Sequence, residues 1–337
     1  MRVVHLVRSS WPTVGGLEAS VHGLAKAQRA EGLQVVVAAP GARAGVFEGV
    51  RYRPLRRLGP RRYPGALGLR RALAEADVVH VHGLDLLADA AVRLHPRVGV
   101  STHGGYFHHD RHRLLKRVVM RLMTTPTLRR AQAVWYTSRA DQLRLAACGV
   151  EGEVIGDGIE LAALRRGLDP VPGRWVVPGR VDGHKGHLDL LRAIDAMPGG
   201  GPRELRVVGP VAAPDVAAAL RGRGVVVTGA LDREAYLDEL RQADRVVCPS
   251  RSEGFGIAAL EVMAMGVPVV LSDIPAHREL DPCSGARVDL RGTGAGPALQ
   301  EAARLAPEQC VARQRAAASH SWGRVAARFV QAYRAMS

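Results

Sequence analysis

The chain is poor in cysteine, in acidic residues and in long apolar runs, and each shortage excludes a class of protein. No CxxC pair occurs among its four cysteines, which argues against a disulfide framework and a zinc site; they are Cys148, Cys248, Cys283 and Cys310. No apolar run approaches the roughly 18 residues that cross a bilayer. The N-terminal MRVVHLV is too short for a signal peptide and predicts a first strand. We therefore expect a cytoplasmic protein.

The shortage of acid leaves 32 Asp and Glu against 47 Lys and Arg, a formal net charge of +15. Much of the excess gathers in Arg51–Arg62 and in Arg111–Arg130. The second segment carries apolar residues at helical spacing, namely Leu114, Leu115, Val118, Val119 and Leu122. A basic amphipathic helix of this kind, with its charge at Arg113–Arg121, often lies on anionic lipid. We therefore expect peripheral binding at the inner face of the plasma membrane. A solvated face is the alternative, and no recognition motif supports nucleic acid as a partner.

The length and the apolar pattern predict two α/β domains. A chain of 337 residues exceeds the usual limit of a single core. Short apolar runs alternate with helical patterns, which is typical of parallel strands joined by crossover helices. We expect two doubly wound, Rossmann-like domains that face each other across a cleft. The first covers residues 1–166 and the second 167–321, and the last helix, residues 322–337, is a candidate to pack back on the first.

One segment, Pro249–Val270, carries most of the functional signal. A predicted strand ends before a small-residue turn that opens a helix, and the turn contains Glu253, Gly254 and Gly256. The first amides of a helix lack partners within it and favour an anion, and the glycines permit close approach of a ligand. Glu261 lies farther along the same apolar helix, where an unpaired carboxylate is costly. A ligand with phosphates and hydroxyls, such as a sugar nucleotide, suits this combination; a simple cap and an exposed helix residue are the alternative.

Two glycine-containing loops follow predicted strands in the first half of the chain. Gly15, Gly16 and Glu18 open a helix after the first strand, although they lack the spacing of a dinucleotide fingerprint. His103 follows a buried run and precedes two glycines. A histidine there can bond a sugar hydroxyl or a developing charge, and a loop histidine satisfied by backbone is the alternative. His80 and His82, in VVHVHG, predict strand positions with a structural role.

A third loop brings two cations to the end of a strand in the second half of the chain. Arg180 and Lys185 bracket the turn in PGRVDGHKGHLDLL. The planar guanidinium of arginine fits phosphate oxygens, and lysine supplies a point charge. We expect this pair to bind a diphosphate; the alternative is that both are surface cations with no binding role.

These loops together resemble the retaining glycosyltransferases of family 4, which have the GT-B fold of two Rossmann-like domains. The E-x7-E signature matches at Glu253 and Glu261, the GRxxxxKG element at Arg180 and Lys185, and the glycine loop at Gly15-Gly16. Several segments further resemble the bacterial exopolysaccharide mannosyltransferases of the xanthan and acetan pathways, which move mannose from GDP-mannose to a polyprenyl-diphosphate-linked disaccharide. Those segments are RYP at 62–64, ADVVHVHGLD at 76–85, STHGGYFH at 101–108, SRSEGFGIAALE at 250–261 and LSDIP at 271–275.

The resemblance implies a role for each of these residues. Glu253 would bind hydroxyls of the donor sugar, His103 would lie near that sugar, and these two are the candidate catalytic residues. Glu261 would hold the ribose. Arg180 and Lys185 would neutralise the diphosphate, with amides from Gly254, Phe255, Gly256 and Ile257, and the glycine loop would comprise Gly15, Gly16 and Glu18.

The resemblance also implies a nucleotide-sugar co-substrate, GDP-mannose, with no cofactor and no metal. A UDP- or ADP-sugar with a soluble acceptor, a sugar-nucleotide epimerase and a nucleic-acid-binding protein are the alternatives. Two departures from the family pattern stand out. Asp157 in Gly156-Asp157-Gly158 replaces an expected asparagine, and Gly209-Pro210 replaces an expected glycine pair.

Overall fold

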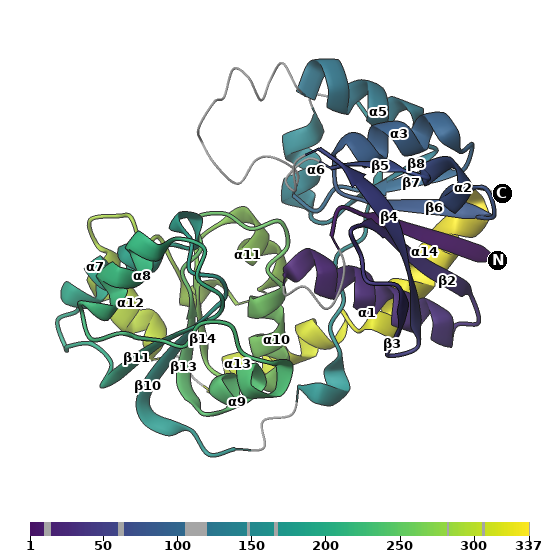
Figure 1. Cartoon of the computed structure of the whole chain (residues 1–337). Coiled ribbons are helices and arrows are strands. Elements are labelled where there is room, and N and C mark those ends of the chain that lie inside the picture. Colours follow the sequence, from purple (N-terminus) through teal and green to yellow (C-terminus); the bar gives the residue numbers. More distant parts are fainter. Residues whose placement is uncertain are drawn as a thin grey trace. The chain divides into compact units, whose positions relative to one another are not determined.

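The protein, seen in a computed structural model, divides into two compact units, which we call unit 1 and unit 2 (Figure 1). Unit 1 combines Met1–Gly158 with His320–Ser337, and unit 2 is Ile159–Ser319. The structure describes residues 1–9, 15–59, 64–104, 120–146, 149–164, 168–281, 283–304 and 307–336. Within these ranges, no helix is both long and apolar enough to cross a membrane.

Unit 1 is built on a nine-stranded sheet with the strand order β3-β4-β2-β1-β6-β7-β8-β9, and β5 pairs with β4. The strands are parallel apart from β3 and β5, which run antiparallel to β4. Valine-rich runs such as β1 and β6 are buried throughout almost their whole length, as expected for a parallel sheet covered on both faces. The bounds are β1 (Arg2–Val7), β2 (Gln34–Pro40), β3 (Gly45–Phe47), β4 (Val50–Leu58), β5 (Gly65–Leu67), β6 (Val78–His82), β7 (Val98–Ser101), β8 (Ala133–Tyr136) and β9 (Glu153–Val154).

Helices cover both faces of this sheet and create two cores. One core joins the sheet to α2, α3 and α5 through residues such as Leu73, Leu87 and Leu128. The other joins it to α1 and α14, which lie side by side, through residues such as Leu24 and Phe329 (Figure 1). The bounds are α1 (Gly16–Ala30), α2 (Leu69–Leu73), α3 (Leu86–Leu94), η1 (Met120–Thr124), α5 (Thr125–Arg130), α6 (Arg139–Leu145) and α14 (Trp322–Ala335).

Unit 2 has a six-stranded sheet in the order β12-β11-β10-β13-β14-β15, with every pair parallel. Its strands are β10 (Val171–Pro178), β11 (Glu204–Val208), β12 (Val226–Val227), β13 (Ala243–Cys248), β14 (Val269–Ser272) and β15 (Arg287–Val288). Its helices are η3 (Leu161–Ala163), η4 (Gly183–Lys185), α7 (His187–Asp195), α8 (Pro214–Arg221), α9 (Arg233–Arg241), α10 (Ile257–Met265), α11 (Pro275–Leu280), η5 (Ser284–Ala286), α12 (Ala295–Ala303) and α13 (Pro307–Ala318).

The strand order reverses once in each sheet, and these reversals decide where ligands can bind. In unit 1 the chain winds outward from β1 to β2 and β4, and then returns to β6 on the other side of β1. In unit 2 the same reversal lies between β10 and β13. The predicted doubly wound α/β architecture is therefore confirmed, and loops beyond the carboxyl ends of these strands are the natural ligand sites.

The structure describes most of the first basic segment but only part of the second. The first includes β4, in which Val50, Tyr52 and Leu55 are buried, so part of its charge is carried by a strand of the sheet. In the second, the predicted basic helix with Arg113–Arg121 falls on residues that lie outside the described ranges, apart from the start of η1 at Met120.

Gly186 fixes the turn between β10 and α7 against the end of β13. Its φ of +70° lies in the left-handed region, and a Cβ at this position would overlap the carbonyl group of Pro249. Only glycine therefore permits the turn that carries Lys185 to approach the loop that carries Glu253.

We predict that Gly186→Ala destabilises the chain by about 3 kcal/mol, because it combines left-handed strain with a backbone clash. Gly183→Ala is the matched control, since Gly183 lies in the same turn with open space around it. The control should change the free energy of unfolding by less than about 0.5 kcal/mol. Urea denaturation measures both, and equal effects of the two substitutions would contradict the assignment.

Candidate active site

The reversal point of unit 2 brings together a lysine and a glutamate from two loops. Lys185 ends η4 after β10, and Glu253 follows β13. The Lys185 ammonium donates to Glu253 Oε1 at 2.6 Å, and the Ser250 hydroxyl donates to the same oxygen at 2.6 Å. Both members of the ion pair have 18% of their side chains exposed, so the pair is shielded but open to a ligand.

Glu253 is held in its ionised form. Burial alone would raise the pKa of its carboxyl group, but the charge and hydrogen bond of Lys185, together with Ser250, outweigh burial and lower the pKa to about 2. The group is therefore a carboxylate at every physiological pH and can only accept hydrogen bonds. Ligand hydroxyls are its natural partners.

Helix α10 begins at Ile257, four residues after Glu253. Gly256 is the N-cap with a φ of +102°, and a Cβ there would lie 3.2 Å from Leu280 and 3.4 Å from His277. Glycine is thus needed both for the backbone conformation and for space. The first amides of a helix have no partners within the helix, and its dipole is positive at that end, so the start of α10 favours an anion.

His277 is a site residue that the sequence analysis missed. It is 1% exposed, and its Nδ1 bonds the Ser272 carbonyl oxygen at 3.0 Å. Burial lowers its pKa, whereas the charge of Glu253 raises it. His277 lies on α11 and is close to Gly256 only in the folded chain. No local sequence pattern therefore predicts that it belongs to this site.

Glu261 is not an isolated carboxylate. Arg233 of α9 donates to its Oε1 at 2.6 Å, and the Tyr236 hydroxyl lies 3.3 Å from its Oε2. The Arg233 guanidinium also lies over the Tyr236 ring at 5.6 Å. This pairing explains how an apolar helix accommodates a carboxylate that is 6% exposed.

Arg180 lies in the same turn as Lys185 but is exposed. Its carbonyl oxygen is 3.2 Å from His187 Nε2, which ties the turn to the first residue of α7. The structure thus brings Lys185 and Glu253 together and places Arg180 on the adjoining surface.

In unit 1, His103 follows β7 with a φ of +46°, a left-handed conformation that is costly for a residue with a side chain. Asp141, which is fully buried, forms hydrogen bonds with the residues on both sides of His103. Its carboxylate accepts from the Thr102 hydroxyl and, at 3.3 Å, from the Gly104 amide. Such strain persists only where surrounding contacts impose it, and it marks His103 as a functional candidate.

Two carboxylates from other loops lie near His103. Asp157 Oδ1 is 4.0 Å from His103 Nδ1 and accepts a hydrogen bond from Ser20. Burial lowers the pKa of His103, whereas the charge of Glu18, in the first turn of α1, raises it. The Glu18 carboxylate also accepts a hydrogen bond from the Ser9 hydroxyl. Asp157, the departure noted in the sequence, is therefore a buried neighbour of the histidine.

The glycine loop lies at the start of α1. Gly15 is the N-cap in an extended conformation, and a Cβ there would overlap the Glu18 carboxylate. Gly16 is exposed with open space beside it. A ligand can therefore approach the backbone at Gly16 closely.

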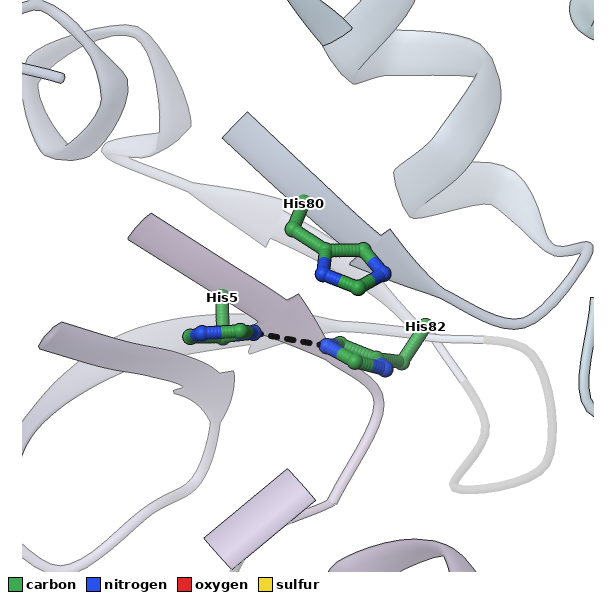
Figure 2. A group of neighbouring side chains, drawn as sticks. All are labelled: His5, His80 and His82. Carbon is green, nitrogen blue, oxygen red and sulfur yellow. Dashed lines mark hydrogen bonds between the residues drawn. The ribbon is translucent and has the colours of Figure 1, made fainter. Parts of the chain in front are cut away.

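Three further histidines, His5, His80 and His82, lie together in the sheet of unit 1 (Figure 2). One ring nitrogen from each histidine lies within 4.8 Å of the other two, which is close enough for a metal ion to be shared. Both nitrogens of every ring, however, are already in hydrogen bonds with other side chains. The donor set therefore fits a hydrogen-bonded network better than a metal ion.

The sequence of each half of the chain matches a glycosyltransferase family. Residues 14–163 match the family described as Glycosyltransferase Family 4, and residues 172–292 match Glycosyl transferases group 1. A GDP-mannose:cellobiosyl-diphosphopolyprenol alpha-mannosyltransferase of Xanthomonas oryzae pv. oryzae is 32% identical over 85% of this chain and 82% of its own. Proteins of the same description from Xanthomonas campestris and Komagataeibacter xylinus are 30% and 29% identical over 99% of this chain, and over 97% and 93% of their own.

Solved structures agree with the fold. Sucrose-phosphate synthase from Thermosynechococcus elongatus superposes with a TM-score of 0.76 at 20% identity, covering 100% of this chain and 99% of its own. Anabaena HepE in complex with UDP and glucose superposes with a TM-score of 0.75 at 16% identity, covering 99% and 100%. With the predicted resemblance confirmed in this way, the chain belongs to the family 4 glycosyltransferases, which have the GT-B fold.

Proposed function

We propose that this glycosyltransferase transfers mannose from GDP-mannose to a saccharide linked to polyprenyl diphosphate. The Lys185–Glu253 pair at the start of α10 is the observation that carries the proposal, because it sets a cation for phosphate beside an acceptor for sugar hydroxyls. The relatives at 29–32% identity, whose descriptions include GDP-mannose and a diphosphopolyprenol acceptor, support this choice of donor and acceptor.

The proposal gives unit 2 the nucleotide sugar. Lys185 and Arg180 bind the diphosphate, and the amides of Gly254, Phe255, Gly256 and Ile257 add donors from the helix start. Each charge-assisted hydrogen bond of this kind contributes about 1.5–3 kcal/mol where it is shielded. The charge on the departing diphosphate grows as the sugar–oxygen bond breaks, so these donors stabilise the transition state most.

The two glutamates divide the hydroxyl groups of the donor. Glu253 accepts from hydroxyls of the transferred mannose, since its pKa of about 2 keeps it ionised. Glu261 accepts from the ribose hydroxyls. A carboxylate has about four lone-pair sites, so Arg233 and Tyr236 leave acceptor capacity for a ribose.

Unit 1 contacts the transferred sugar and the acceptor in this proposal. His103 forms a hydrogen bond with a sugar hydroxyl, and the loop of Gly15, Gly16 and Glu18 contacts the ligand. The bond from the anomeric carbon to the GDP oxygen breaks while a bond to the acceptor oxygen forms on the same face. The acceptor proton passes to the leaving diphosphate oxygen, and the configuration of the sugar is retained.

We infer that this transfer needs neither a bound metal nor a cofactor. The argument is electrostatic, because Arg180, Lys185 and the start of α10 supply positive charge where a divalent cation would otherwise act. The nucleotide sugar is a co-substrate.

A lipid-linked acceptor lies in the membrane, so the basic segment at Arg113–Arg121 would bring the enzyme to its substrate by binding the membrane surface. Basic side chains contribute about 1 kcal/mol each to binding at an anionic membrane surface. We propose that this segment holds the enzyme at the cytoplasmic face of the membrane.

We predict that the purified chain transfers mannose from GDP-mannose to a polyprenyl-diphosphate-linked disaccharide. Turnover should persist in excess chelator, and the new linkage should keep the α configuration of the donor. Parallel assays with UDP-glucose and ADP-glucose test the rival donors. Faster turnover with either of them would refute the choice of GDP-mannose, and activity restored by magnesium after chelation would refute metal independence.

We predict that Lys185→Ala and Glu253→Ala each lower kcat/KM by about a hundredfold to a thousandfold, because each removes a contact made to the transition state. Lys26→Ala is the matched control, as Lys26 forms an exposed pair with Glu48 at 2.8 Å. The control should stay within about twofold of wild type. Near-wild-type turnover of either site variant would remove these residues from the site.

We predict that the chain binds vesicles of anionic phospholipid and that salt weakens the binding. Replacing Arg113, Lys116 and Arg117 with Glu should weaken binding by about 3 kcal/mol or more, on the order of a hundredfold. The control replaces Arg192, Arg221 and Arg291 of unit 2, all exposed, with Glu. Vesicle sedimentation measures both, and equal losses would show only a general effect of net charge.

A further inference from the structure

A continuous line of hydrogen bonds runs from His103 into the interior of unit 1. His103 Nε2 lies 2.9 Å from His82 Nδ1, and His82 Nε2 lies 2.7 Å from His5 Nδ1 (Figure 2). His5 Nε2 lies 2.7 Å from Gln28 Oε1. The line thus crosses from the loop after β7 through β6 and β1 to α1.

The line continues from α1 to the last helix and back to the sheet. Gln28 Nε2 donates to the Tyr333 hydroxyl at 2.9 Å. That hydroxyl lies 2.6 Å from His80 Nδ1, and His80 Nε2 lies 2.6 Å from Ser101 Oγ. Gln28 and Tyr333 are fully buried, so water does not compete for these bonds.

The four imidazoles of the line are neutral at physiological pH. Burial lowers the pKa of His5 to about 4, and burial also lowers the pKa values of His80, His82 and His103. A neutral imidazole carries one ring proton, so one of its nitrogens donates and the other accepts. The tautomer of each ring therefore determines the tautomer of the next ring in the line.

The amide of Gln28 fixes the direction of the whole line. Its Oε1 can only accept, so His5 carries its proton on Nε2 and accepts at Nδ1. His82 must then donate from Nε2 to His5 and accept at Nδ1. His103 must in turn donate from Nε2, which leaves its Nδ1 without a proton. Reversing the amide of Gln28 would reverse every one of these bonds.

We propose that Gln28 is a positioning residue that acts through His5 and His82 to keep the Nδ1 of His103 free of a proton. This nitrogen, 4.0 Å from Asp157 Oδ1, then forms with that carboxylate a pair of acceptors, which suits neighbouring hydroxyl groups of a sugar. The inference rests on the proposed function in one respect, the identity of the sugar as the transferred mannose. Tyr333 supports Gln28 by accepting from its amide.

The test reads the ring protons directly, in the full-length chain with isotopically labelled histidine and no substrate. Ring-nitrogen NMR distinguishes protonated from unprotonated nitrogens, and loss of signals in His103→Gln identifies His103. We predict that wild-type His103 is protonated on Nε2 alone. In Gln28→Leu, which removes the partner of His5, a form protonated on Nδ1 should appear.

Kinetics supply the second readout. Gln28→Leu should lower kcat by about tenfold or more, because a histidine in the wrong tautomer is a poor partner for its ligand. The KM for GDP-mannose should stay within about twofold, since unit 2 carries the proposed nucleotide contacts. Should Gln28→Leu not fold, Gln28→Met gives the same test, because the unbranched side chain of methionine has no amide oxygen to accept from His5.

Tyr52→Phe is the matched control, because it removes another buried tyrosine–histidine bond in unit 1, that of Tyr52 to His22 at 2.7 Å. It should leave the tautomer of His103 and kcat unchanged. A proton on Nδ1 of wild-type His103, or an unchanged tautomer in Gln28→Leu, would overturn the proposal. So would ring signals of His5, His80 and His82 that move on chelation, since these rings would then hold a metal. Failure to use GDP-mannose would refute only the proposed donor, because the NMR measurement contains no substrate.

Discussion

The contact between Lys185 and Glu253 is the interaction on which the proposed nucleotide-sugar site of unit 2 depends. It joins the loops that leave the two strands at which the order of the unit 2 sheet reverses. Gly186, next to Lys185, lets these loops approach each other, and Gly256, three residues after Glu253, lets α10 begin there. The pair keeps both charges in place in a shielded setting, so binding of a diphosphate does not have to order them first.

Unit 1 differs in that its candidate histidine, His103, lies at the end of an uncharged network of hydrogen bonds. Burying a charge inside its sheet would be costly, and neutral imidazoles avoid that cost as long as every ring nitrogen is paired. Pairing in turn removes the freedom of each ring to choose its tautomer. The enzyme therefore combines a charged pair in unit 2, which we assign to the nucleotide sugar, with a neutral hydrogen-bonded network in unit 1 behind the histidine that we assign to the sugar.

Most of the scaffold could be predicted from the sequence, because valine-rich strands and loop glycines leave local signals. Glu253, Lys185 and His103 stand out for the same reason, as each follows a strand end. Arg233 could not be connected with Glu261, since they lie on different helices and meet only in the folded chain. The strand β4 was not predicted, because its arginines mask the three buried residues Val50, Tyr52 and Leu55. The line from His103 to Tyr333 depends on tertiary packing alone, and no spacing reveals it.

The helix α14 has a consequence for how the chain matures. Tyr333, which completes the network behind His103, is separated in sequence from the rest of unit 1 by the whole of unit 2. During synthesis, the ribosome therefore releases all of unit 2 before the core of unit 1 can close around α14. In a nascent chain, all of unit 2 is therefore available to fold before the network behind His103 can be completed.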